Sequence, residues 1–246
     1  MRKLNLMKTA IVTGSGGGLG SAICKELLSL GFQIIAIDII PTKQLTSLLK
    51  NRNCHCIGGV DFSNRKSIEK SILKLFPNKD ITVLINNAGI SVGGKLLDET
   101  ISDWQKMIDV NLTAPFILSQ AFVKNCEQFH IQGSIVNISS MAGIVGAKKP
   151  GYAASKAGLL GLTKSIAMQT GPDIRCNAIY PGAILTPMTA DWDEETKKKI
   201  VNNTPIGRIA NPEEIAKIVA FLIDSEKSGY LTGTVINATG GQYLGQ

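Results

Sequence analysis

The chain has 246 residues, of which 44% are hydrophobic and 18% charged, a balance that fits a globular protein able to bury a full core. No apolar run approaches the ~20 residues that span a bilayer, and residues 1–7 lack the apolar centre of a signal peptide. We therefore expect a cytoplasmic protein with no membrane partner.

Lysine and arginine total 26 against 19 acidic residues, but the cations are scattered along the chain. The densest run, 197–199, follows Asp191, Asp193, Glu194 and Glu195, which predicts a solvated helix with acids in its first turn and bases in its last. This pattern does not favour nucleic acid as a partner.

Five cysteines are present, at 24, 54, 56, 126 and 176, and an odd count without a secretory signal predicts reduced thiols. Cys54-His55-Cys56 resembles a ligand pair, but no second Cys/His pair follows at zinc spacing. We interpret this stretch as a strand with alternating faces and expect no metal site.

Apolar strand patterns alternate with helical stretches from end to end, with no repeat and no linker. The central strands are almost continuous Val, Ile and Leu, which is typical of strands buried on both faces. This order predicts a single-domain, Rossmann-like, doubly wound α/β sheet of about seven parallel strands, with helices on both faces, over residues 1–246. The expected strands are 9–13, 33–37, 54–60, 82–86, 134–138, 175–179 and 234–237. The expected helices are 19–30, 42–50, 64–75, 102–127, 151–169 and 212–224, the last capped by Asn211 with Pro212 at its first position.

The first strand leads directly into Thr13-Gly-Ser-Gly-Gly-Gly-Leu-Gly20, and a helix follows. Glycines at 14, 18 and 20 let the backbone approach a pyrophosphate, whose charge the helix N-terminus stabilises. Asp38 ends the second strand, where a carboxylate can accept both hydroxyls of an adenosine ribose and would repel a 2′-phosphate. Since the neighbouring Gly17 and Ile39 are neutral, we expect NAD rather than NADP; the alternative role for Asp38 is to cap the turn that follows.

Tyr152 and Lys156 lie one helical turn apart, so both leave the same helix face. Lowering the pKa of a phenol from 10 to about 7 needs roughly 4 kcal/mol. One cation at about 4 Å supplies roughly that much at an effective dielectric constant near 20. The pair therefore predicts a general acid/base, whereas the plain alternative is a half-buried tyrosine on a surface helix.

With these residues in place, the chain closely resembles the short-chain dehydrogenase/reductase family over nearly its whole length. The resemblance rests on these motifs: Thr13 to Gly20; Asn86-Asn-Ala-Gly89; Asn111; Tyr152 with Lys156; Pro181-Gly182 with Thr186; and Gly233-x-x-Ile236-Asn237 followed by Gly240-Gly241.

The resemblance implies an oxidoreductase that transfers a hydride between NAD(H) and a secondary alcohol or its ketone. Tyr152 would exchange the proton with the substrate oxygen, and Lys156 would lower the pKa of Tyr152 and bond the nicotinamide ribose. Asn111 would hold a water in a proton relay to Lys156. A serine would polarise the substrate oxygen: spacing to Tyr152 favours Ser139, whereas the context of Gly143 favours Ser140, which we choose.

By the same resemblance, further cofactor contacts fall on the loop and on later segments. They are Gly14, Ser15, Gly17, Gly18, Leu19, Gly20, Asp38, Asp61, Phe62, Asn87, Pro181, Ile184 and Thr186, with Tyr152 and Lys156.

The substrate pocket is expected among residues 91–94, 141–147 and 184–206, with Trp192 on a lid and with Lys148 and Lys149 as solvated loop lysines at the rim.

An alternative function is a 3-oxoacyl thioester reductase, on acyl-carrier-protein or CoA substrates; these relatives usually carry a basic residue where this chain has Gly17. An alternative of another class is a non-catalytic dinucleotide-sensing regulator, disfavoured because Tyr152 and Lys156 are both present. Apolar residues on more than one face of the two longest helices, together with the resemblance, predict a homotetramer.

Overall fold

The computed structural model describes residues 8–39 and 51–245. The predicted helix 42–50 lies outside the described residues. None of the helices in the described parts of the chain is long and apolar enough to span a bilayer.

Seven strands form one parallel sheet in the order β3-β2-β1-β4-β5-β6-β7, which confirms the predicted architecture. All seven predicted strands are present in the predicted chain order, although the third ends at Ile57 rather than at residue 60. Because every described strand joins the same sheet, we infer a single domain. The strands are β1 (Thr9–Thr13), β2 (Gln33–Ile37), β3 (Cys54–Ile57), β4 (Ile81–Asn86), β5 (Gly133–Ile138), β6 (Ile174–Pro181) and β7 (Val235–Ala238).

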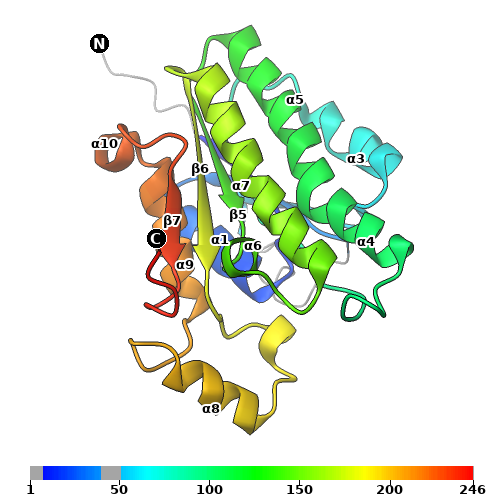
Figure 1. Ribbon diagram of the computed structural model, residues 1–246. Helices are drawn as coiled ribbons and strands as arrows, with labels where there is room; N and C mark the ends of the chain where they lie inside the picture. Colours follow the sequence, from blue (N-terminus) through cyan, green and yellow to red (C-terminus); the bar gives the residue numbers. More distant parts are fainter. Residues whose placement is uncertain (1–7, 40–50, 246) are drawn as a thin grey trace.

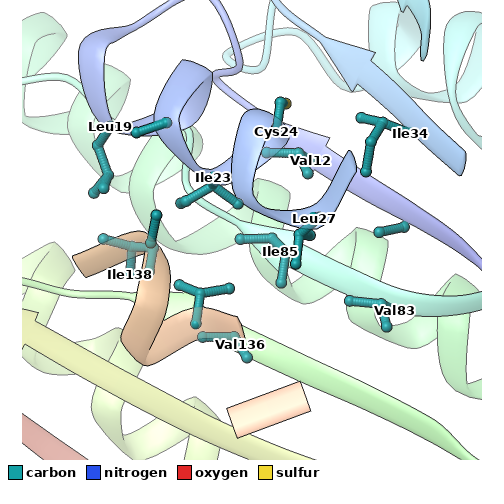
Figure 2. Close-up of a cluster of buried hydrophobic side chains, with 14 of the residues drawn as sticks. Val12, Leu19, Ile23, Cys24, Leu27, Ile34, Val83, Ile85, Val136 and Ile138 are labelled. Atoms are coloured by element: carbon teal, nitrogen blue, oxygen red, sulfur yellow. The ribbon is translucent and has the colours of Figure 1, made fainter. Parts of the chain in front are cut away.

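Helices cover both faces of this sheet, which explains why the central strands are hydrophobic without alternation (Figure 1). Ala10 and Val12 point to the face covered by α1 (Gly18–Ser29) and α9 (Pro212–Ile223), whereas Ile11 points to the other. Figure 2 shows the first of these two cores, which contains Ile23 and Leu27 of α1 together with Val12, Ile85 and Val136 of the sheet. The opposite core holds Phe122 of α5 (Ala114–Phe129) and Ala167 of α7 (Pro150–Thr170).

The long helix predicted over 102–127 is interrupted. It consists of α4 (Ile101–Ile108), a π-helical turn η2 (Asp109–Thr113) and α5. A π turn inserts one extra residue into the helix, an irregularity that the sequence analysis did not predict. Such turns occur frequently at functional sites, and this one carries Asn111.

The remaining helices are shorter. The acid-to-base segment forms α8 (Glu194–Asn202) as predicted, with the Asp193 carboxylate accepting the Thr196 N–H at 2.7 Å. Asn211 begins α9 in a capping box with Glu214, also as predicted. The others are α3 (Arg65–Ser71), η1 (Leu73–Leu75), α6 (Ala142–Val145), η3 (Pro187–Thr189) and α10 (Ser225–Ser228).

The strand order reverses at β1, which lies between β2 and β4. The Asn87 side chain, just after β4, donates hydrogen bonds to the carbonyls of Thr13 at 2.9 Å and Gly14 at 3.0 Å, just after β1. The two loops are thereby joined at the carboxyl edge of the sheet, which is where doubly wound folds bind ligands.

Candidate active site

A cavity of about 870 Å³ opens at this edge, within the usual range for ligand sites. Its wall is built from the glycine loop, the carboxyl ends of β2, β4, β5 and β6, and the first turns of α7. Most of the predicted site residues line it, namely Gly14, Gly17, Gly18, Leu19, Gly20, Asp38, Asp61, Phe62, Asn87, Ser140, Tyr152, Lys156, Pro181, Ile184 and Thr186. Ser15 and Asn111 lie behind the wall.

The glycines of the loop are required by close backbone approaches. Gly14 has φ +65°, and a Cβ there would lie 2.7 Å from the Ala88 Cα. A Cβ at Gly20 would overlap the Gly14 carbonyl oxygen. Ser15 is fully buried, and its hydroxyl donates to the carbonyls of Val12 at 3.1 Å and Ile37 at 3.0 Å. Ser15 therefore holds the loop against β1 and β2 rather than facing the cavity.

This loop fits a dinucleotide. Helix α1 begins at Gly18 with no acidic side chain in its first turn, so its free N–H groups can face a pyrophosphate without competition. On the opposite side of Gly18 a Cβ would meet the side chains of Pro187 at 3.1 Å and Thr186 at 3.2 Å. The segment after β6 therefore packs directly onto the glycine loop.

Two carboxylates mark the β2–β3 side of the cavity. The Asp38 Oδ2 accepts the Gly16 N–H at 2.7 Å, which fixes the carboxylate against the glycine loop. The Asp61 Oδ1 accepts from the Ser63 N–H at 2.9 Å and the Ser63 hydroxyl at 2.7 Å, at the turn into α3. Phe62 lies beside Asp61 in the wall. Asp61 thus forms the turn and lines the cavity at once.

The two adjacent serines have different surroundings. The Ser139 hydroxyl is buried and donates to the Lys156 carbonyl at 2.8 Å, which joins β5 to α7. Ser140 instead lines the cavity together with Tyr152. Burial raises the pKa of Tyr152, and the Ser140 side chain acts in the opposite direction. Of the two candidates, Ser140 is therefore the one that acts on the phenol.

Lys156 is almost fully buried, and its ammonium donates to the Ile138 carbonyl at 2.8 Å. Burial lowers the pKa of Lys156 to about 8. Burial is the largest influence on the pKa of Tyr152, and the Lys156 ammonium donates to the carbonyl at the end of β5, so a lowering of the Tyr152 pKa by Lys156 stays a prediction.

Asn111 lies in the π turn behind Lys156. Its Oδ1 accepts the Ile90 N–H at 2.9 Å, and its amide donates to the Ile90 carbonyl and the Ser155 hydroxyl, both at 3.0 Å. A Cβ on Gly89 would lie 3.1 Å from the Lys156 Nζ and 3.4 Å from the Asn111 Oδ1, so the two side chains are close neighbours. The Asn111 side chain therefore fixes the segment after β4 against α7.

The sequence analysis missed Glu99 and expected Lys149 in solvent at the rim, but both have contacts beside the start of α7. The Glu99 Oε1 accepts the Gly151 N–H at 2.9 Å and so caps α7 from another segment. Lys149 lines the cavity and donates to the Ser91 carbonyl at 3.1 Å. Neither belongs to a local motif, since both contacts join segments more than 50 residues apart.

Comparison with known proteins identifies the family. The family model described as Enoyl-(Acyl carrier protein) reductase matches residues 14–242. The human (3R)-3-hydroxyacyl-CoA dehydrogenase is 36% identical over 96% of this chain and 95% of its own. The chain belongs to the short-chain dehydrogenase/reductase family. Another relative, the 3-oxoacyl-[acyl-carrier-protein] reductase FabG of Aquifex aeolicus, is 37% identical over 96% of this chain and 97% of its own.

Solved structures of this family show the same fold. A 4-hydroxyisoleucine dehydrogenase complexed with NADH superposes with a TM-score of 0.90 and 32% identity, covering 97% of this chain and 100% of that one. A putative 2-deoxy-d-gluconate 3-dehydrogenase from Agrobacterium tumefaciens with bound NADP superposes with a TM-score of 0.88 and 31% sequence identity, covering 98% of this chain and 99% of that one. The chain is thus a short-chain dehydrogenase/reductase oxidoreductase that acts on CH–OH groups.

Proposed function

We propose that this short-chain dehydrogenase/reductase interconverts a secondary alcohol and its ketone with NAD(H), using Tyr152 as the general acid/base. The observation that carries the proposal is that Tyr152, Ser140 and Lys156 line the same cavity as the glycine loop. Two hydroxyls at one point of the wall can both bind a substrate oxygen.

In the oxidation direction Tyr152, as phenolate, takes the proton of the substrate hydroxyl while Ser140 donates a hydrogen bond to the same oxygen. In the reduction direction Tyr152 returns that proton to the carbonyl oxygen as its charge develops. The dinucleotide supplies the hydride chemistry when bound. Lys156 is buried beside this site, and the Ile138 carbonyl takes one of its three N–H donors. The others are available to the ribose of the cofactor.

We further infer that NAD(H) is preferred over NADP(H), because the Asp38 carboxylate lies in the cavity wall beside the glycine loop. NAD(H) should bind at least about tenfold more tightly, a difference of about 1.4 kcal/mol. Asp38→Ser should reduce this preference, since it removes both the acceptor for the ribose hydroxyls and the repulsion of a 2′-phosphate. Fluorescence titration of NADH and NADPH into both proteins measures the ratio. Equal affinities in the unsubstituted protein would refute the role of Asp38.

A 3-oxoacyl thioester is a second candidate substrate, because the relatives above are a hydroxyacyl-CoA dehydrogenase and an acyl-carrier-protein reductase. Consumption of NADH with a 3-oxoacyl thioester, compared with that of simple ketones, decides between them.

We also propose that the protein is a homotetramer of the cytosol, where its five free thiols would stay reduced. Two of the apolar residues on the long helices, Phe122 and Leu159, are buried within the subunit and so cannot contact another subunit. Phe116 on α5 and Ile101 on α4, however, are 49% and 83% exposed. Phe116→Glu should therefore weaken assembly, as measured by light scattering at micromolar concentration. A monomeric unsubstituted protein would contradict the proposal.

A further inference from the structure

Lys149 lies at the start of the helix that carries Tyr152. It is the N-cap residue of α7, is partly buried, and lines the cavity, whereas its neighbour Lys148 is exposed and is not part of the wall. The sequence analysis placed both lysines in solvent at the rim. The difference arises because the Ser91 carbonyl accepts a hydrogen bond from the Lys149 Nζ at 3.1 Å and so turns that side chain inward.

The charges around the cavity are unevenly distributed. Among the described residues the carboxylates in the wall are Asp38 and Asp61, both on the β2–β3 side of the glycine loop, whereas Tyr152 and Lys149 lie on the β5 side. The nearby Glu99 carboxylate accepts the Gly151 N–H instead. Within the described part of the chain, the four ion pairs leave Lys149 unpaired. Lys106 of α4 also lines the cavity and is also outside these four ion pairs, but it is exposed, whereas Lys149 is partly buried at the start of the helix that carries Tyr152.

We propose that Lys149 binds a carboxylate of the substrate, so that the enzyme acts on a short hydroxy acid or the corresponding oxo acid. Lys149 precedes Tyr152 by three residues and both side chains line the same cavity, so the ammonium and the phenol can engage two groups of one small molecule. One of the three N–H donors of Lys149 is used by Ser91, and the other two can bind a carboxylate.

A phosphate is the other anion that a substrate of this family could bring. In a pantetheine thioester the phosphate lies at the far end of the pantetheine arm, many bonds from the reacting carbon, so it cannot reach Lys149 while that carbon is at Tyr152. The position of Lys149 next to the phenol thus favours a carboxylate on the same short carbon chain. This inference rests on the function proposed above.

The test uses two pairs of substrates for NADH-dependent reduction: a short 3-oxo acid with its methyl ester, and a short 4-oxo acid with its methyl ester. Within each pair, kcat/KM of the acid is compared with that of the ester. We expect the unsubstituted enzyme to prefer the acid. Lys149→Met keeps the length of the side chain and disturbs no cap, because the Lys149 side chain makes no capping hydrogen bond. It should lower the acid-to-ester ratio of kcat/KM about 10- to 100-fold, the loss of one charged hydrogen-bonded contact. Lys148→Met is the matched control and should keep the ratio of the unsubstituted enzyme.

A binding measurement separates this inference from the proposed function. Butanoate and its methyl ester are titrated calorimetrically into the protein with NADH, and Lys149→Met should lose the selectivity for butanoate. If neither the oxo acids nor their esters are reduced, but the preference for binding butanoate over its methyl ester depends on Lys149, the proposed function fails and the carboxylate site stands. If the ester is preferred, or if Lys149→Met and Lys148→Met give the same ratios in both measurements, the carboxylate site is wrong.

Discussion

Tyr152→Phe is expected to lower turnover by about 10²–10⁴-fold, the usual effect of losing a general acid/base, while dinucleotide affinity stays close to that of the unsubstituted enzyme. The substitution removes one hydroxyl and keeps the ring, so the packing of α7 is preserved. The phenol is the group on which Ser140 acts, and Ser140 cannot replace it because an aliphatic hydroxyl has a far higher pKa. Steady-state kinetics with a ketone substrate, together with NADH titration, provide the measurement.

Tyr230→Phe is the matched control, since Tyr230 is fully exposed, and it should leave turnover unchanged. Ser140→Ala is the companion variant. Because the Ser140 side chain lowers the pKa of Tyr152, its removal should move the rise of the oxidation rate to higher pH, whereas Ser139→Ala should not act on the phenol in this way. Near-normal turnover in a folded Tyr152→Phe protein would show that Tyr152 only packs in the structure and is not the general acid/base.

Lys156→Met should reduce dinucleotide affinity about 10- to 100-fold and turnover about 10²–10³-fold, yet leave the folded protein no less stable near neutral pH. The ammonium is buried, and its pKa is lowered from the usual 10.5 to about 8. Below pH 8 it stays charged in the folded state at a cost of about 3 kcal/mol. Removing the charge removes that cost. The gain offsets the loss of the hydrogen bond to the Ile138 carbonyl, which is worth about 1–3 kcal/mol of folding free energy.

The pH dependence of stability identifies this effect. Between pH 8 and 10.5 the unfolded chain holds the Lys156 proton and the folded protein releases it, so the stability of the unsubstituted protein should rise with pH in that window. Lys156→Met should lack this rise, and Lys164→Met, which alters an exposed lysine on the same helix, should keep it. Urea unfolding at a series of pH values measures the slopes. Parallel slopes in all three proteins would show that Lys156 is not a buried charge.

The fold followed from the sequence because its signals are local. Runs of Val, Ile and Leu predicted the central strands, Asn211 predicted the start of α9, and the order of acids before bases at 191–199 predicted α8. The π turn around Asn111 was missed because one extra residue in a helix hardly changes the order of apolar residues. Local patterns therefore predict elements better than irregularities inside them.

The site was harder to predict because several roles depend on contacts between distant segments. Ser139 and Ser140 are equivalent in sequence, and only the packing of β5 against α7 directs one to the Lys156 carbonyl and the other to the phenol. Lys148 and Lys149 differ in the same way, through the carbonyl of Ser91. The surroundings of Tyr152 also depend on its burial, a property of the folded molecule that the spacing of Tyr152 and Lys156 does not contain.

The bond between Ser139 and Lys156 has a consequence for how the cavity admits and releases its ligands. Gly143 adds to it, since a Cβ there would lie 2.7 Å from backbone atoms of Lys156 and Ala157. The wall that carries Ser140 and Tyr152 is thus held by this bond and by the close approach of Gly143 to the backbone of α7. Thr186 and Pro187, by contrast, contact the glycine loop at Gly18 through their side chains. We therefore expect substitutions at Thr186 and Pro187 to alter the rate of ligand exchange more than the alignment of Ser140 and Tyr152.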